Sequence, residues 1–159
     1  MVPFFVDGNP YANGIVPNIN ALATALRAAG GCVAWVLPAP SPTAAMEEFL
    51  GRTSRSRTED APRDIFVEKS AASAFFPDTC DLGAQRDRRS VDTVMVEGTV
   101  ANVCCEFTAR DPSTLGSRTI TVADANAAQR DHDLDSTLDT SYRSFGDVRP
   151  TVELVHLLG

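Results

Sequence analysis

The chain has 159 residues, enough for one domain with one hydrophobic core, and we expect residues 1–159 to form a single domain. Its formal net charge of -7 disfavours non-specific binding to nucleic acid or to an anionic membrane surface. No apolar run approaches the roughly 18 residues that a membrane-spanning helix needs, and the N-terminus does not resemble a signal peptide. These features predict a cytoplasmic protein without nucleic-acid or membrane partners.

The N-terminal part contains turn signals, one amphipathic helix and one apolar run. Residues 7–14 carry glycine, proline and asparagine at close spacing and predict a loop. Pro17 suits the first turn of a helix that Gly30 and Gly31 end. The apolar stripe of this helix consists of Ile19, Leu22, Ala23 and Leu26. The run at 32–37 is typical of a buried parallel strand.

The middle of the chain is richer in loop signals. Residues 38–63 are rich in proline, serine, threonine and charge, and contain one short helical segment at 43–50. A second strand is predicted at 64–69. The small and aromatic residues at 70–77 suggest a loop that lines a site, and 81–89 predict a polar helix.

Strands and helices alternate again in the C-terminal half. Apolar runs at 93–98 and 118–123 predict a third and a fourth strand. Between them a helix is expected from about Val103, which Pro112 should end or kink. This alternation predicts an α/β fold of three α/β/α layers, with a mostly parallel sheet between the helices.

Two further helices complete the predicted elements. Residues 131–145 form an amphipathic pattern, with Asp131 as the expected capping residue. The apolar face of that helix consists of Leu134, Leu138, Tyr142 and Phe145. A connector at 145–150 precedes a last helix at 151–158, for which Thr151 is the expected N-cap.

The four cysteines do not form a metal-binding pattern. They contain no C-x-x-C pair, and their spacing to the chain's two histidines does not match a zinc site. We therefore expect no metal and no cofactor. In a cytosolic protein free thiols are expected, so one cysteine is available for catalysis and the others are small buried residues.

Two strand ends carry chemically useful groups. The strand at 93–98 leads to Cys104 in the first turn of the next helix, where backbone N–H groups stabilise a thiolate and an oxyanion. The strand at 64–69 ends in Lys69, a cation that stabilises a nearby thiolate. By position alone, a buried structural cysteine and a solvated lysine are the commoner roles, so these patterns establish only an α/β domain.

Several longer segments resemble the isochorismatase-like cysteine hydrolase family, which includes nicotinamidases, N-carbamoylsarcosine amidases and ureidoacrylate amidohydrolases. The most specific is GTVANVCCEFTARDPSTLG at 98–116, similar to the nucleophile segment of that family. VEKSAASAFFPDTCDL at 67–82 resembles its lysine segment. Weaker likenesses occur at 6–31, 123–128 and 145–154, so the resemblance covers nearly the whole chain.

The resemblance implies a role for each matching residue. Cys104 matches the nucleophile and Lys69 the catalytic lysine. It also implies a cis peptide bond at Thr99–Val100, with the N–H groups of Val100 and Cys104 as the oxyanion hole. Phe75 and Phe76 are expected to line the substrate pocket, although core packing accounts for them equally well.

The implied activity is hydrolysis of a C–N, amide-type bond in a small molecule through a cysteine thioester. Family members usually assemble as dimers or tetramers, so a homo-oligomer is expected. The sequence departs from the family at its start, because the catalytic Asp and the first strand would align before Met1. Glu97 also replaces a usually small residue. None of the other carboxylates in the chain matches the position of that catalytic Asp, so none is a good candidate to replace it as the base. The candidates considered are Asp7, Asp78, Asp81 and Asp124.

These departures leave an alternative open. A noncatalytic or degenerate relative, lacking the catalytic Asp, would act as a binding or assembly subunit.

Overall fold

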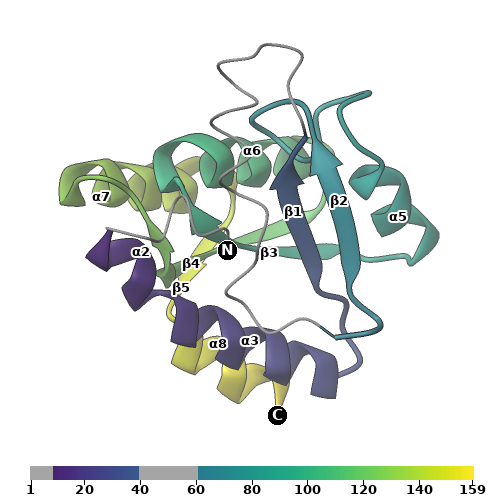
Figure 1. Ribbon diagram of the computed structural model, residues 1–159, viewed down its shortest axis with the longest axis horizontal. Coiled ribbons are helices and arrows are strands. Elements are labelled where there is room, and N and C mark those ends of the chain that lie inside the picture. Colours follow the sequence, from purple (N-terminus) through teal and green to yellow (C-terminus); the bar gives the residue numbers. More distant parts are fainter. Residues whose placement is uncertain (1–8, 40–60) are drawn as a thin grey trace.

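Short parallel strands joined by helices make up the computed structural model, which describes residues 9–39 and 61–159 (Figure 1). The strands are β1 (Ala34–Pro38), β2 (Ile65–Lys69), β3 (Thr93–Thr99), β4 (Arg118–Ala127) and β5 (Asp147–Arg149). The helices are α2 (Pro10–Gly14), α3 (Val16–Ala28), α5 (Leu82–Arg88), α6 (Glu106–Thr114), α7 (Asp131–Thr140) and α8 (Thr151–Leu158). Two π-helical turns adjoin them, η1 (Ala101–Cys105) and η2 (Ser141–Phe145).

The described strands pair in parallel and form two separate sheets. One contains β1 and β2, with Ala34 opposite Ile65 and Pro38 opposite Lys69. The other has the order β3-β4-β5. The register of β3 against β4 shifts between Val96 and Gly98, near the carboxyl end of β3.

Helices cover both faces of the strands, as the sequence predicts. In Figure 1, α3 and α8 lie below the strands, and α6 and α7 lie above them. Met95 packs against a core cluster that includes Ile19 of α3 and Leu154 of α8. Its neighbour Val96 packs on the other side, against Ala109 of α6. Because successive residues of a strand point to opposite faces, this confirms the three-layer α/β/α arrangement.

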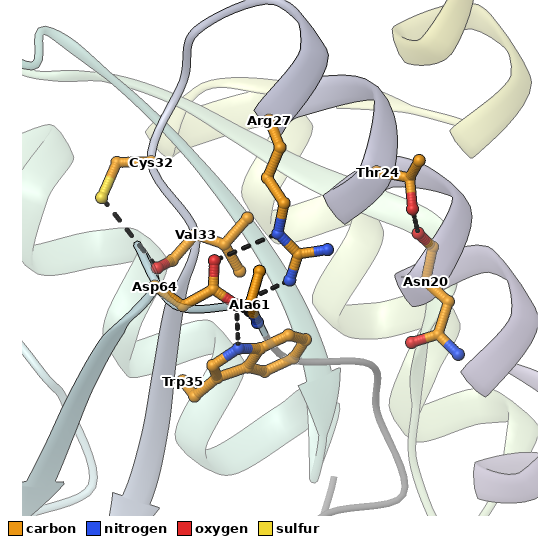
Figure 2. A network of polar contacts seen from close by, with 8 residues as sticks. All are labelled: Asn20, Thr24, Arg27, Cys32, Val33, Trp35, Ala61 and Asp64. Carbon is orange, nitrogen blue, oxygen red and sulfur yellow. Dashed lines mark hydrogen bonds and ion pairs between the residues drawn. The ribbon is translucent and has the colours of Figure 1, made fainter.

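A buried carboxylate joins α3 to the start of the two-stranded sheet. Asp64, directly before β2, accepts hydrogen bonds from Nε of Arg27 at 3.0 Å and from the indole N–H of Trp35 at 2.6 Å (Figure 2). The backbone N–H of Ala61 donates to the same carboxylate at 2.9 Å. The Arg27 guanidinium, ahead of the other partners, holds the pKa of Asp64 below its ordinary value.

Most predicted elements are present, with boundaries shifted by a few residues. The helix with Pro17 in its first turn is α3, and Gly30 beyond its end has φ +81, in the left-handed region that favours glycine. The polar helix predicted at 81–89 is α5. The segment 70–77 has no helix or strand, as expected.

Two segments predicted as connections contain regular structure. The expected loop at 7–14 includes α2, because the Asn9 side chain accepts hydrogen bonds from the N–H groups of Tyr11 and Ala12. The expected connector at 145–150 includes the short strand β5, which pairs with β4. Three residues are too few to give a strand pattern, so pairing with β4 defines this element.

The helix does not end at Pro112. It begins earlier than predicted, at the π-helical turn η1, and α6 continues past Pro112 to Thr114. A proline lacks the N–H that would bond one turn back and its ring crowds the carbonyl there, yet the helix extends two residues beyond it. The Pro112 side chain is fully buried at this position of the helix.

The helix predicted at 131–145 is present as α7 and η2, but its buried face differs. Thr137 and Ser141 are buried, whereas Tyr142 is 67% exposed. Small side chains let α7 lie close to its neighbours, and the hydroxyl of Thr137 donates to Oε2 of Glu106 at 2.9 Å.

The two predicted N-caps were also wrong. Arg130 is the N-cap residue of α7, and Asp131 lies inside its first turn. Pro150 precedes α8, and the hydroxyl of Thr151 donates to Asp124 of β4 at 2.7 Å. Each predicted cap is therefore one residue inside its helix, and Thr151 instead attaches α8 to the sheet.

The helix predicted at 43–50 and the alignment of the first residues with the family lie outside the described residues. Among the helices that the structure describes, none is long and apolar enough to span a membrane.

Candidate active site

Cys104 lies at the end of β3, where the strand changes into a helix. The register shift before Gly98 bends the end of the strand, and Gly98 has φ +132, which favours glycine. The buried Asn126 of β4 spans this irregularity. Its side-chain amide donates to the carbonyl of Val96 at 2.9 Å and to that of Val122 at 2.7 Å. These bonds fix the strand end that precedes Cys104.

The π-helical turn η1 presents Cys104 and buries its neighbour. The Thr99–Val100 peptide bond is cis, which confirms the bond that the family resemblance implied. The carbonyl of Val100 accepts from the N–H groups of Val103 at 3.1 Å and Cys105 at 3.3 Å. Cys104 is partly exposed, whereas burial raises the pKa of the Cys105 thiol to about 12. Of the two adjacent thiols, only Cys104 is accessible for chemistry.

Lys69 is brought into the interior at the end of β2. The residue is 8% exposed, and its ammonium donates to the carbonyl of Ala72. Among the described residues, no carboxylate lies within ion-pair distance of this ammonium. The following loop is tied to α6, since the N–H of Ala74 bonds to the hydroxyl of Thr108 at 3.2 Å. A buried cation without a carboxylate partner is available to an anion in the site.

A cavity of about 600 Å³ brings these groups together. Its wall includes Lys69, Cys104 and Phe75, three of the residues predicted for the site. Phe76 is 57% exposed and is not part of this wall. Val100 is also outside the wall, although Thr99 beside it is included. The structure therefore places the predicted nucleophile, the lysine and one of the two aromatics around one space.

Glu97 is a further cavity residue for which the sequence analysis expected no role. It is the one carboxyl-bearing side chain among the described residues that line the cavity. Among the described residues its buried Oε2 atom has no hydrogen-bond partner. Burial, with a smaller contribution from the charge of Asp124, raises the pKa of Glu97 to about 8. A carboxyl group in place of a small residue just before Gly98 was the signal in the sequence.

The rest of the wall is mostly apolar and comes from many elements. Every residue of β1 and of β3 contributes to it, together with residues of α3 and α5. Within residues 9–39 and 61–159, no three His, Cys, Asp or Glu side chains lie close enough together to hold a metal ion. The arrangement offers a thiol, an ammonium and a carboxyl group beside an apolar space, a combination suited to small organic substrates.

Solved structures of similar fold include several hydrolases. A cysteine hydrolase from Pseudomonas syringae pv. phaseolicola has a TM-score of 0.85 and 27% identity, over 99% of this chain and 88% of that one. N-carbamoylsarcosine amidase from Thermoplasma acidophilum has a TM-score of 0.78 and 27% identity, over 95% and 92% of the two chains. Nicotinamidase PncA from Bacillus subtilis, at 19% identity and a TM-score of 0.79, shares the fold over 93% and 94%.

The sequence comparisons agree with these structures. The isochorismatase family protein YwoC of Bacillus subtilis is 34% identical over 92 residues, which are 58% of this chain and 48% of YwoC. The match therefore spans about half the length of that relative. The Isochorismatase domain matches residues 1–151, nearly the whole chain. The chain belongs to the isochorismatase family of hydrolases.

Proposed function

We propose that this chain hydrolyses a C–N, amide-type bond in a small molecule, with Cys104 as the nucleophile. The observation that carries the proposal is the presence of Cys104 and the buried Lys69 in the wall of one cavity. Two relatives at 27% identity support it, one described as a cysteine hydrolase and one as N-carbamoylsarcosine amidase.

Cys104 lies where a negative charge formed on its sulfur during the reaction would be stabilised. The residue lies in the first turn of a helical segment, where backbone N–H groups point toward a negative charge. The Lys69 ammonium faces the same cavity and adds a positive charge that no described carboxylate neutralises. In the proposed reaction Lys69 holds the thiolate before attack.

The oxyanion of the reaction needs hydrogen-bond donors near Cys104. We assign this role to the backbone N–H groups of Val100, the residue before η1, and of Cys104 within it. The aromatic ring of Phe75 would contact the substrate beside them, because it lies in the cavity wall. Phe76 is exposed in the described structure and serves less well for this role.

The thiol proton also needs an acceptor. Glu97 is the carboxyl group in the cavity wall, and with a pKa of about 8 it is mostly protonated at neutral pH. It becomes an acceptor as it ionises. If Glu97 serves as the base, the rate of thioester formation rises with pH through about 8.

The proposed reaction has two stages, formation of a thioester on Cys104 and its hydrolysis. The thiol proton passes to the base, and the thiolate sulfur forms a bond to the carbonyl carbon of the substrate. The C–N bond then breaks, and the leaving amine or ammonia takes the proton. Water attacks the thioester, which releases the acid and restores the thiol.

The test is a screen of small amides and ureido compounds with the wild-type chain and two variants. Cys104→Ala is expected to abolish any hydrolysis that the wild type performs, by at least about a thousandfold. Cys80→Ala is the control, since Cys80 is also partly exposed and does not line the cavity. Full hydrolysis by Cys104→Ala would overturn the proposal. A wild type with no activity on any amide would favour a binding or assembly role instead.

The proposal includes a homo-oligomer, a dimer or tetramer, because the family resemblance implies one. Light scattering on the eluted protein measures the mass directly. A monomer at micromolar concentration would contradict this part of the proposal without affecting the chemistry.

A further inference from the structure

Residues 70–80, the lysine loop, follow Lys69 and carry hydrogen bonds of their own. The two ends of the loop meet where the N–H of Ser70 donates to the carbonyl of Thr79 at 3.3 Å. Within the loop the Cys80 thiol donates to the carbonyl of Ala74 at 3.1 Å. Because these bonds hold the loop together, its contacts with other elements decide where it lies as a unit.

One hydrogen bond joins the lysine loop to α6 within residues 9–39 and 61–159. The N–H of Ala74, a residue that is 1% exposed, donates to the hydroxyl of Thr108 at 3.2 Å. A buried backbone N–H that loses its acceptor costs the full price of its desolvation. The position of the loop against the helix therefore depends on an oxygen atom at residue 108.

This bond lies between the two groups of the proposed reaction. On the loop side, the Lys69 ammonium donates to the carbonyl of Ala72. On the helix side, Thr108 lies four residues after Cys104, and both side chains line the cavity with Lys69. The ammonium lies near the cysteine pair, since its charge acts against the burial that raises the pKa of Cys105. Two hydrogen bonds and one helical turn thus connect the ammonium to the nucleophile.

We propose that Thr108 is a positioning residue, which sets the place of the Lys69 ammonium relative to the Cys104 thiol. The inference rests on the proposed function, in which Lys69 holds the thiolate before attack. The interaction between two charges weakens with distance, so a lysine loop displaced from α6 stabilises the thiolate less. The role requires a β-hydroxyl as hydrogen-bond acceptor, which serine supplies and valine does not.

Two other helical threonines show what a hydroxyl without this role does. The hydroxyls of Thr24 and Thr114 donate to the carbonyl four residues earlier, at 2.8 and 2.9 Å. Both bonds stay within one helix, whereas the bond of Thr108 reaches a separate segment. Thr114 is on the same helix as Thr108, so Thr114→Val is a matched control.

The test measures the alkylation of Cys104 by iodoacetamide across pH, with Cys32 at the start of β1 as the reference thiol. Thr108→Val keeps the shape of the side chain and removes its oxygen. We expect it to slow alkylation of Cys104 at pH 7 by about threefold or more and to move the pH profile of the rate upward. Thr108→Ser should stay within about twofold of wild type, because its hydroxyl is kept. Thr114→Val should react like wild type.

A Lys69→Met background shows whether Thr108 acts through the ammonium. Lys69→Met by itself should slow alkylation of Cys104, and adding Thr108→Val should slow it no further. Equal slowing by Thr108→Val in both backgrounds would overturn the proposal. A Thr108→Val protein that reacts like wild type would overturn it too, and so would a Thr108→Ser protein as slow as Thr108→Val.

Amide hydrogen exchange of the wild-type chain gives a measurement that does not depend on how the variants fold. We expect the Ala74 N–H to exchange as slowly as the paired amides of β2. Exchange as fast as that of an exposed amide would overturn the proposal. None of these measurements uses hydrolysis, so a wild type without amidase activity contradicts the proposed function alone.

Discussion

Asp64 at the amino end of β2 and Glu97 near the carboxyl end of β3 are both acidic groups removed from water, yet their surroundings are opposite. The Asp64 side chain is 2% exposed, and Arg27, Trp35 and Ala61 all donate to it. Oε2 of Glu97 is equally enclosed but accepts no hydrogen bond from the part of the chain that the structure describes. Surrounding groups lower the pKa of Asp64, whereas burial raises that of Glu97 to about 8.

This difference separates a stabilising region from a reactive one. A buried carboxylate with enough donors holds elements together, as Asp64 holds α3 to β1 and β2. A buried carboxyl group without donors destabilises the fold, and such groups concentrate at functional sites. The comparison predicts opposite effects on stability when each acidic side chain is replaced by its amide.

The largest expected effect is that of Asp64→Asn. This variant removes the buried negative charge to which Arg27, Trp35 and Ala61 donate, and we expect a loss of about 2–4 kcal/mol in the free energy of unfolding. Urea unfolding at pH 7 measures it. Asp92→Asn is the control, because the Asp92–Arg118 pair is exposed on both sides and should matter little. An Asp64→Asn protein as stable as wild type would refute the stabilising role.

The Asp64 contribution also depends on pH in a defined direction. Because the folded state lowers the pKa of Asp64 below 3.8, its stabilisation is present above that pH. It is lost as the pH falls through the lowered pKa. The difference in stability between wild type and Asp64→Asn should therefore shrink below about pH 4.

The effect of Glu97→Gln is expected to be smaller and opposite in sign. The unfolded state releases the Glu97 proton near pH 4.5, and the folded state keeps it up to about 8. The folded wild type is therefore increasingly destabilised from about pH 4.5 to 8, and the Gln variant is not. We expect Glu97→Gln to be more stable than wild type at pH 8, by about 1–3 kcal/mol, and similar to it at pH 4.5.

Glu68→Gln, on the exposed face of β2, is the matched control for this measurement and should not differ between the two pH values. If Glu97→Gln is less stable than wild type at pH 8, the Glu97 carboxylate has partners that hold its charge, and the comparison fails.

The smallest expected effect concerns the strand end beside Glu97. Asn126→Ala removes the two hydrogen bonds that span the register shift, and we expect a loss of about 1–2 kcal/mol. Thermal unfolding compares it with Asn18→Ala, whose side chain donates to Asp124 from an exposed position. Equal effects of the two substitutions would show that the register shift does not depend on Asn126.

The sequence predicts the layers of this fold well because periodicity reports burial. The apolar stripe that contains Ile19 and Leu22 correctly predicted α3, and the apolar run at 93–98 correctly predicted β3. The sequence analysis missed elements that depend on contacts with distant parts of the chain. The strand β5 exists through pairing with β4, and η2 turns the Tyr142 side chain outward although its spacing fits the helical stripe.

The same distinction applies to the site residues, because some belong to local motifs and others are placed only by the fold. Family segments located Cys104, Lys69 and the cis bond before Val100, since local motifs survive in the sequence. No motif could show that Phe75 reaches the cavity while Phe76 points outward. The cavity likewise depends on how β1 and β3 are placed in the fold, which no single segment encodes.

The central claim, that Cys104 is an activated nucleophile, is tested most directly by its alkylation rate at pH 7. The four cysteines are labelled with iodoacetamide in the folded chain, and the rates are read by peptide mapping. Cys32 and Cys80 are partly exposed like Cys104 and serve as references, whereas Cys105 is buried. The account predicts that Cys104 reacts at least about tenfold faster than the other three. A Cys104 rate equal to that of Cys32 and Cys80 in the folded protein would contradict it.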